Sequence, residues 1–269
     1  MSKITFATCW YNLDNKKFER TTYINWISNF FKICNNFNCV LFTDDNSIGD
    51  IKDLIDSNKK NIKIIIKPME EFYNYKYREF WIKNNNRNDN PLRHINWKVN
   101  MLWSEKIHFV NEVAQNKYFE TEYYGWCDIG YFRNRKNDTS IDKLIHWPLS
   151  DKITKLDKDK IHYGLINTNN IKNVFLQIKN TNSKGLPIIP LDPNIVTIGG
   201  GFFIGTRDKI YNWKNMYDRK LLLYFNNNYL VKDDQMIIIT CILSNTELFK
   251  LHIENNNLFD KWFMFQRLL

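Results

Sequence analysis

The chain has 269 residues, 43% of them hydrophobic, and a formal net charge of +9 at pH 7. This hydrophobic content is enough to bury a core and excludes disorder for most of the chain. The 38 basic residues are interleaved with 29 acidic ones, so the positive charge is not massed in a block of the kind that indicates nucleic acid as the main partner.

The cysteines and the N-terminus bear on the compartment. The five cysteines form no Cys-x-x-Cys pair, and an odd count does not indicate a disulfide framework. The chain passes from Met1-Ser2-Lys3 directly into a strand-like run, without the apolar stretch of a signal peptide, and no segment reaches the roughly 18 apolar residues of a membrane span. We therefore expect a cytoplasmic protein. The abundance of asparagine, isoleucine and lysine indicates an AT-rich genome, bacterial, parasitic or viral.

The first third of the chain alternates between strands and helices. Apolar runs and helical spacing predict, in chain order, a strand over 4–10, a helix over 18–31, a strand over 39–43, a helix over 48–55 and a strand over 62–66. This alternation is typical of a parallel sheet covered by helices. Ligands bind such sheets beyond the carboxyl ends of the strands, so segments 8–11 and 43–45 should line one crevice.

The rest of the chain is less regular. It predicts, in order, an amphipathic surface helix over the basic and aromatic stretch 72–81, a long helix over 97–114 that breaks near Ser104, a buried strand over 123–127, a glycine segment over 199–205, an apolar helix that starts near Asp233 and a strand over 249–253. No repeat or linker divides the sequence. We expect one α/β domain over residues 1–269, with a mostly parallel central sheet flanked by helices.

The most informative stretch is Trp-Cys-Asp-Ile-Gly-Tyr-Phe-Arg over 126–133. Asp128 emerges at the carboxyl end of an apolar strand, where a carboxylate is costly to place without a partner. If the ligand is a nucleotide diphosphate, Mn²⁺ or Mg²⁺ held by Asp128 could bridge its phosphates. Gly130 would allow close backbone approach and Arg133 would add positive charge. Alternatively, Asp128 caps the next turn and pairs with Arg133.

Two further segments have both a functional and a structural interpretation. The glycines at 199–201 would let backbone amides approach a sugar, or they belong to a strand with a bulge or a tight turn. Asp233 and Asp234 precede an apolar helix, and in the structural interpretation both carboxylates favour its positive N-terminus. In the functional interpretation, Asp234 faces the sugar and acts as general base on an acceptor hydroxyl or contacts a sugar hydroxyl.

Three single residues complete the candidates. His252 is a candidate metal ligand on a predicted strand, or a satisfied histidine of that strand. Lys106 would meet donor phosphates, or it is a solvated helix lysine. Asp44 would accept a hydrogen bond from a nucleobase, or it forms a turn.

Several segments together carry a resemblance to a known family: Thr8-Cys9-Trp10-Tyr11, Phe42-Thr43-Asp44, Lys106, Trp126-Cys127-Asp128-Ile129-Gly130 and Gly200-Gly201-Phe202-Phe203-Ile204-Gly205. Over residues 3–240 the chain resembles the HtrL/YibB family, which is regarded as glycosyltransferase-like. The resemblance implies a Rossmann-like GT-A fold for nucleotide sugars.

The resemblance also implies roles for individual residues. Donor-binding residues would be Thr8, Trp10, Tyr11, Asp44, Lys106, Gly200 and Gly201. Asp128 and His252 would hold the metal, and Asp234, Asp233 and Arg133 would be catalytic. The GT-A motif has two carboxylates in a DxD-like arrangement, whereas here Asp128 is followed by Gly130. Only one carboxylate of this motif can bind metal, which leaves strict metal dependence open.

We therefore expect a glycosyltransferase. It would move a sugar from a nucleotide-diphosphate sugar, with UDP-sugar favoured, to a hydroxyl of a glycan, glycoprotein or lipid-linked sugar, with metal assistance. Two alternatives stay open: a nucleic-acid or polyanion-binding protein, and a catalytically silent relative that binds sugar nucleotides. Asp128 behind an apolar strand favours the transferase, because binding to a phosphate backbone does not call for a carboxylate there.

Overall fold

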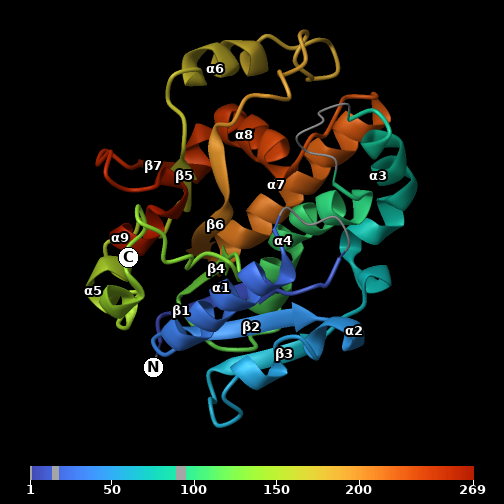
Figure 1. The fold of residues 1–269 in the computed structure, drawn as a ribbon. Coiled ribbons are helices and arrows are strands. Elements are labelled where there is room, and N and C mark those ends of the chain that lie inside the picture. The colour runs from blue at the N-terminus through green and yellow to red at the C-terminus, as the bar shows by residue number, and fades with distance from the viewer. Residues whose placement is uncertain (1, 14–17, 89–94) are drawn as a thin grey trace.

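The computed structural model describes residues 2–13, 18–88 and 95–269. Its centre is a seven-stranded sheet of order β3-β2-β1-β4-β6-β5-β7 (Figure 1). The strands are β1 (Ile4–Cys9), β2 (Asn38–Thr43), β3 (Ile62–Ile66), β4 (Tyr123–Cys127), β5 (Ile161–Leu165), β6 (Ile198–Thr206) and β7 (Phe249–Ile253).

Most neighbouring strands are parallel. β1 pairs in parallel with both β2 and β4, β2 with β3, and β5 with β7, whereas β6 runs antiparallel to β4 and β5. The prediction of an α/β fold with a mostly parallel sheet is therefore confirmed. The glycine segment 199–205 lies inside strand β6, and the register between β5 and β6 shifts at Tyr163 and Gly164, so the strand interpretation of this segment is correct.

Helices cover both faces of the sheet. They are α1 (Arg20–Ile33), α2 (Asp45–Ile48), α3 (Arg78–Asn85), α4 (Trp97–Gln115), α5 (Ser150–Ile153), α6 (Ile171–Lys179), α7 (Arg207–Asn226), α8 (Asp234–Ser244) and α9 (Phe265–Leu268). Helix α4 packs on β1 and β4, and α8 packs on β6. No helix in the described part of the chain is long and apolar enough to cross a membrane.

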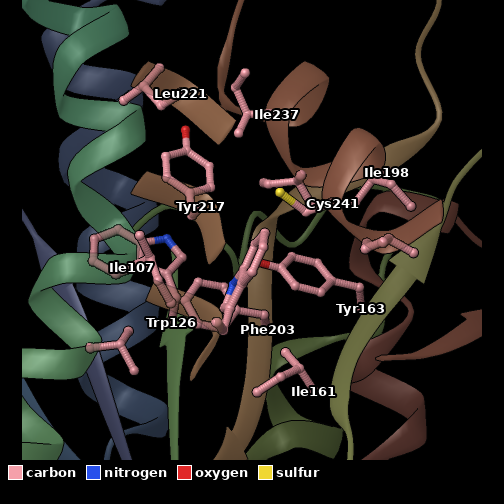
Figure 2. Packing of buried hydrophobic residues seen from close by; sticks show 14 of the residues in the cluster. Ile107, Trp126, Ile161, Tyr163, Ile198, Phe203, Tyr217, Leu221, Ile237 and Cys241 are labelled. Atoms are coloured by element: carbon pink, nitrogen blue, oxygen red, sulfur yellow. The ribbon is translucent and has the colours of Figure 1, made fainter. Parts of the chain in front are cut away.

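The core lies in two clusters, one on each face of the sheet, because successive side chains of a strand point to opposite faces. On one face, Trp126 and Phe203 pack in a cluster with residues of α4, α7 and α8, and Figure 2 shows Tyr217 of α7 above them. On the other face, Phe202 packs in the cluster that contains α1 and the C-terminal segment. Two of the candidate site residues, Lys106 and Asp234, lie on helices of the first face.

Three predicted elements differ from the structure. Helix α4 is continuous through Ser104, whose buried hydroxyl accepts a hydrogen bond from Tyr217 at 2.7 Å. The stretch 72–81 is helical with exposed and buried residues, as predicted, but it begins as a 3₁₀ helix over Tyr73–Tyr77 before it enters α3, and Trp81 is fully buried. The helix predicted over 48–55 is replaced by α2 and a 3₁₀ turn over Lys52–Leu54.

One edge of the sheet collects the segments that the sequence singled out. The carboxyl ends of β1, β2 and β4 lie at the same edge because these strands are parallel. The amino end of β6 lies there too, because β6 is antiparallel to β4 and Cys127 pairs with Phe202. Segments 8–11 and 43–45 therefore follow neighbouring strand ends at this edge, and the crevice that they were expected to line stays a prediction.

Candidate active site

Asp128 stands at this edge, directly after β4. Its backbone N–H donates to the carbonyl of Gly201 at 2.9 Å, which continues the pairing of β4 with β6 beyond the last residue of β4. Its side chain is 39% exposed, whereas β4 is buried along its whole length. The carboxylate is thus held by the sheet and open to solvent.

Two donors already contact Oδ1 of Asp128. The indole N–H of Trp126 donates to this oxygen at 2.6 Å, and Nζ of Lys106 lies 3.1 Å from it. Trp126 and Asp128 are two residues apart, so both side chains project to the same face of the extended chain. The Trp-x-Asp spacing therefore fixes the orientation of the carboxylate, a role that we did not predict for Trp126 although the spacing itself is its sequence signal.

The ammonium nitrogen of Lys106, Nζ, contacts three residues that come from different parts of the fold. Its ammonium donates to the carbonyl of Gly200 at 3.0 Å and lies 3.1 Å from Asp128 Oδ1 and 3.7 Å from Asp234 Oδ2. The lysine is buried in α4. Burial opposes its charge, but Asp128 and Asp234 outweigh burial, so the pKa of Lys106 lies above its ordinary value. The solvated-lysine interpretation is thus wrong.

Asp234 is the buried carboxylate of the cluster, with 4% of its surface exposed in the first turn of α8. Burial raises its pKa to about 7, against the lowering effect of Lys106, and the negative charges of Asp233 and Asp128 add to the rise. A carboxyl group with such a pKa can accept or release a proton near neutral pH.

The neighbouring Asp233 has a structural role. Its side chain caps α8 by accepting from the N–H of Met236 at 3.3 Å, and its other oxygen lies 3.1 Å from Lys232. The helix-capping interpretation is therefore correct for Asp233, while Asp234 pairs with Lys106.

Gly200 and Gly201 of β6 make room for both carboxylates. A Cβ atom at Gly201 would lie 2.9 Å from Asp128 Oδ2, and one at Gly200 would lie 3.1 Å from Asp234 Oδ2. Either distance is shorter than an ordinary contact. The glycines thus let the carboxylates lie directly against the strand, which is a more specific requirement than backbone flexibility.

Arg133 approaches the cluster without pairing with it. Its Nε donates to the carbonyl of Gly130 at 3.1 Å, and its guanidinium lies 4.2 Å from the ring centroid of Trp26. Burial lowers the pKa of Arg133, while Asp128 acts in the opposite direction. Within the described residues no ion pair joins Arg133 to Asp128, so that structural alternative is not supported.

The four candidate donor-binding residues at the ends of β1 and β2 are buried or form hydrogen bonds with other residues of the protein. Trp10 donates to Asp50 at 3.2 Å, the Tyr11 hydroxyl donates to the carbonyl of Lys67 at 2.8 Å, and Asp44 caps α2 by accepting from Ser47 at 2.8 Å. Thr8 is fully buried, and its hydroxyl has no hydrogen-bond partner among the residues that the structure describes. The structural interpretation of Asp44 is therefore supported, with the residue acting as a helix cap instead of in a simple turn.

His252 contacts His162 and not the Asp128 cluster. It lies on β7, at the outer edge of the sheet, and its Nε2 is 2.9 Å from Nδ1 of His162. Burial, followed by the charges of His162 and Lys250, lowers the pKa of His252 to about 4. Over residues 2–13, 18–88 and 95–269, no three His, Cys, Asp or Glu side chains gather closely enough to hold a metal ion.

A small, partly open space lies beside the cluster. Its volume is about 10 Å³, room for roughly one water molecule, and Lys106 and Asp234 line it together with Trp213 and Tyr217. A nucleotide or a sugar is far larger than this space. Any such ligand must therefore reach the cluster from the open side, where Asp128 is exposed.

Known proteins give three findings. A family model described as "Bacterial protein of unknown function (HtrL_YibB)" matches residues 9–268. No curated protein matches the chain. Among solved structures, mouse xyloside xylosyltransferase 1 in its apo form is similar at 11% identity and a TM-score of 0.49, over 92% of this chain and 85% of that one.

Proposed function

The chain belongs to the HtrL_YibB family, a bacterial family of unknown function, and we propose that it is a glycosyltransferase. It would take a sugar from a nucleotide-diphosphate sugar, with UDP-sugar as the first candidate, and transfer it to a hydroxyl of a glycan, glycoprotein or lipid-linked sugar. The whole chain would form one transfer domain of GT-A type. The observation that carries the proposal is the grouping of Asp128, Lys106 and Asp234 beside two side-chain-free positions of β6 at the ligand-binding edge of the sheet.

This geometry suits a nucleotide sugar. Glycines at 200 and 201 leave backbone open beside the carboxylates, where a polar ring can lie close. Lys106 and Arg133 place two positive charges near the only exposed carboxylate of the cluster, where charge develops on a departing diphosphate. The protein would thus act by orienting the donor and by stabilising the leaving group.

Asp234 supplies the proton-transferring group in this proposal. Its pKa of about 7 is matched to the transfer of a proton from an acceptor hydroxyl near neutral pH. Since a Cβ at Gly200 would lie 3.1 Å from its Oδ2, the glycine keeps the approach to Asp234 clear. Asp233, which caps α8, is assigned to holding Asp234 in place.

Among the described residues of this cluster, Asp128 offers a divalent ion one suitable atom. Asp128 Oδ1 is taken by Trp126 and Lys106, which leaves Oδ2. Mg²⁺ and Mn²⁺ are commonly bound by one or two carboxylates together with substrate phosphates, so Asp128 Oδ2 with a nucleotide diphosphate fits such an ion. When bound, it would neutralise charge on the phosphates. We leave His252 out of this site because its Nε2 lies 2.9 Å from His162.

Thermal unfolding with nucleotide sugars tests the proposal. Each of the UDP-, GDP-, CMP- and dTDP-sugars is added with and without Mn²⁺, because a ligand of the native state raises the melting temperature. We expect a rise with one base, and release of the nucleotide diphosphate when an acceptor is added. Asp128→Asn should lose the rise, whereas Asp151→Asn, at a carboxylate that is 72% exposed, should keep it.

Two results would contradict the proposal. A rise with nucleotide but no turnover with any acceptor would identify the silent sugar-nucleotide-binding relative. A rise with an oligonucleotide and with no nucleotide sugar would instead support polyanion binding.

A further inference from the structure

Three oxygens surround the Lys106 ammonium. It donates a hydrogen bond to the Gly200 carbonyl at 3.0 Å and forms ion pairs with Asp128 Oδ1 at 3.1 Å and Asp234 Oδ2 at 3.7 Å. Its side chain is only 11% exposed. A buried charge of this kind is stable only when it is paired and hydrogen-bonded, and here it is both.

The lysine is also fixed in position. The ammonium lies 5.7 Å from the ring centroid of Trp126, which is itself buried and bonded to Asp128. Helix α4, which carries Lys106, packs on both β1 and β4. Removing the ammonium from its place would leave two carboxylates close together, one of them 4% exposed, without a positive charge between them.

A divalent ion that joined the two carboxylates would have to occupy the position of the Lys106 ammonium. Such ions bind several oxygens at once, and Asp128 and Asp234 are the two carboxylates that approach each other at this edge. With the lysine between them, the free protein can offer an ion only Asp128 Oδ2. One monodentate oxygen, with water for the rest, is a weak ligand set.

We propose that Lys106 is the bridging cation of the site: it holds Asp128 and Asp234 together in the place of a divalent ion, so that the free protein binds no metal there. It is a positioning residue for the two carboxylates. A divalent ion then binds only together with a nucleotide diphosphate, whose phosphate oxygens supply the missing ligands. This last step rests on the proposed function, whereas the role of Lys106 does not.

Titration with Mn²⁺ alone, followed by electron paramagnetic resonance of the free ion, tests the proposal on the full chain. Wild type should take up no stoichiometric Mn²⁺. Lys106→Met removes the ammonium but keeps the stem, and should bind one equivalent at least about tenfold more tightly, because affinity rises with the number of charged oxygen ligands. The double change Lys106→Met with Asp234→Asn removes one of these ligands and should return binding to the wild-type level.

Melting temperatures give a second readout. Mn²⁺ should raise the melting temperature of Lys106→Met and leave that of wild type unchanged, because only the variant would bind the ion in its native state. Lys106→Arg keeps the charge and should behave like wild type. Lys106→Gln, which keeps a hydrogen-bond donor, repeats the test if the Met variant does not fold.

Two outcomes would overturn the proposal. One is tight binding of a single Mn²⁺ to wild type that Asp128→Asn abolishes. The other is a folded neutral variant at position 106 that binds Mn²⁺ no better than wild type. Neither outcome depends on nucleotide. A failure of the glycosyltransferase proposal would instead show as no binding of any nucleotide diphosphate, with or without Mn²⁺.

Discussion

Replacing Asp234 by Asn should change how stability depends on pH. The pKa of Asp234 is about 7 in the folded protein and 3.8 as the ordinary value, so the folded state holds a proton that the unfolded state has lost between these two pH values. The free energy of unfolding of wild type therefore falls as pH rises through this window. At 1.36 kcal/mol per pKa unit, the whole effect is about 4 kcal/mol.

Asp234→Asn has no proton to release, so its unfolding curve lacks this fall. Chemical denaturation of both proteins from pH 4 to pH 8 gives two stability curves, and subtracting one from the other cancels the groups that they share. The difference should change by about 4 kcal/mol in favour of the variant as pH rises. Asp151→Asn, at an exposed carboxylate, is the control and should follow wild type. Parallel curves for wild type and Asp234→Asn would refute the argument that burial holds the proton.

Three further changes have definite expected outcomes. Asp128→Ala should lower transfer by about 10² or more while the melting temperature stays within a few degrees, since the residue is part-exposed; a large loss of stability would instead mark Asp128 as structural. Gly201→Ala places a Cβ 2.9 Å from Asp128 Oδ2 and should weaken nucleotide binding measured by calorimetry, whereas Gly49→Ala meets nothing within 4 Å and should not. His252 has a pKa of about 4 when folded and 6.5 ordinarily, so wild type should lose stability as pH falls between these values, and denaturation of His252→Gln should show a smaller loss.

The parallel half of the sheet could be predicted because its signals are local. Each of β1, β2, β3 and β4 is a short, mostly apolar run, and the alternation with helices gives their direction. The position of Asp128 follows from this pattern alone.

Other elements gave no such signal. Strand β5 and helix α7 were not predicted, since α7 spreads its buried residues among many charged ones. The break expected at Ser104 is absent because Tyr217, on α7, donates to the Ser104 hydroxyl, a contact between residues far apart in the chain. The Gly200–Gly201 pair left a turn and a strand equally open, and only the pairing of β6 with β4 decides between them.

In the candidate site too, local sequence patterns predict some features, whereas contacts between distant residues decide others. A lysine in a helix is ordinarily solvated, so the sequence favours that interpretation for Lys106. Its burial results from Asp128 and Asp234, which neither spacing nor composition relates to position 106. For His252 the local pattern places a histidine on a strand correctly, but the neighbour that occupies its ring nitrogen, His162, comes from β5.

The Lys106 junction also has a consequence for folding order. Its ammonium bonds the carbonyl of Gly200, 94 residues further along the chain, and closing so long a loop has an entropic cost that must be met before the contact forms. The charge can be desolvated without penalty only once β4, β6 and α8 have arrived around it. We therefore expect the ion pairs to form late, with sheet assembly, so that no early folding intermediate carries a finished site.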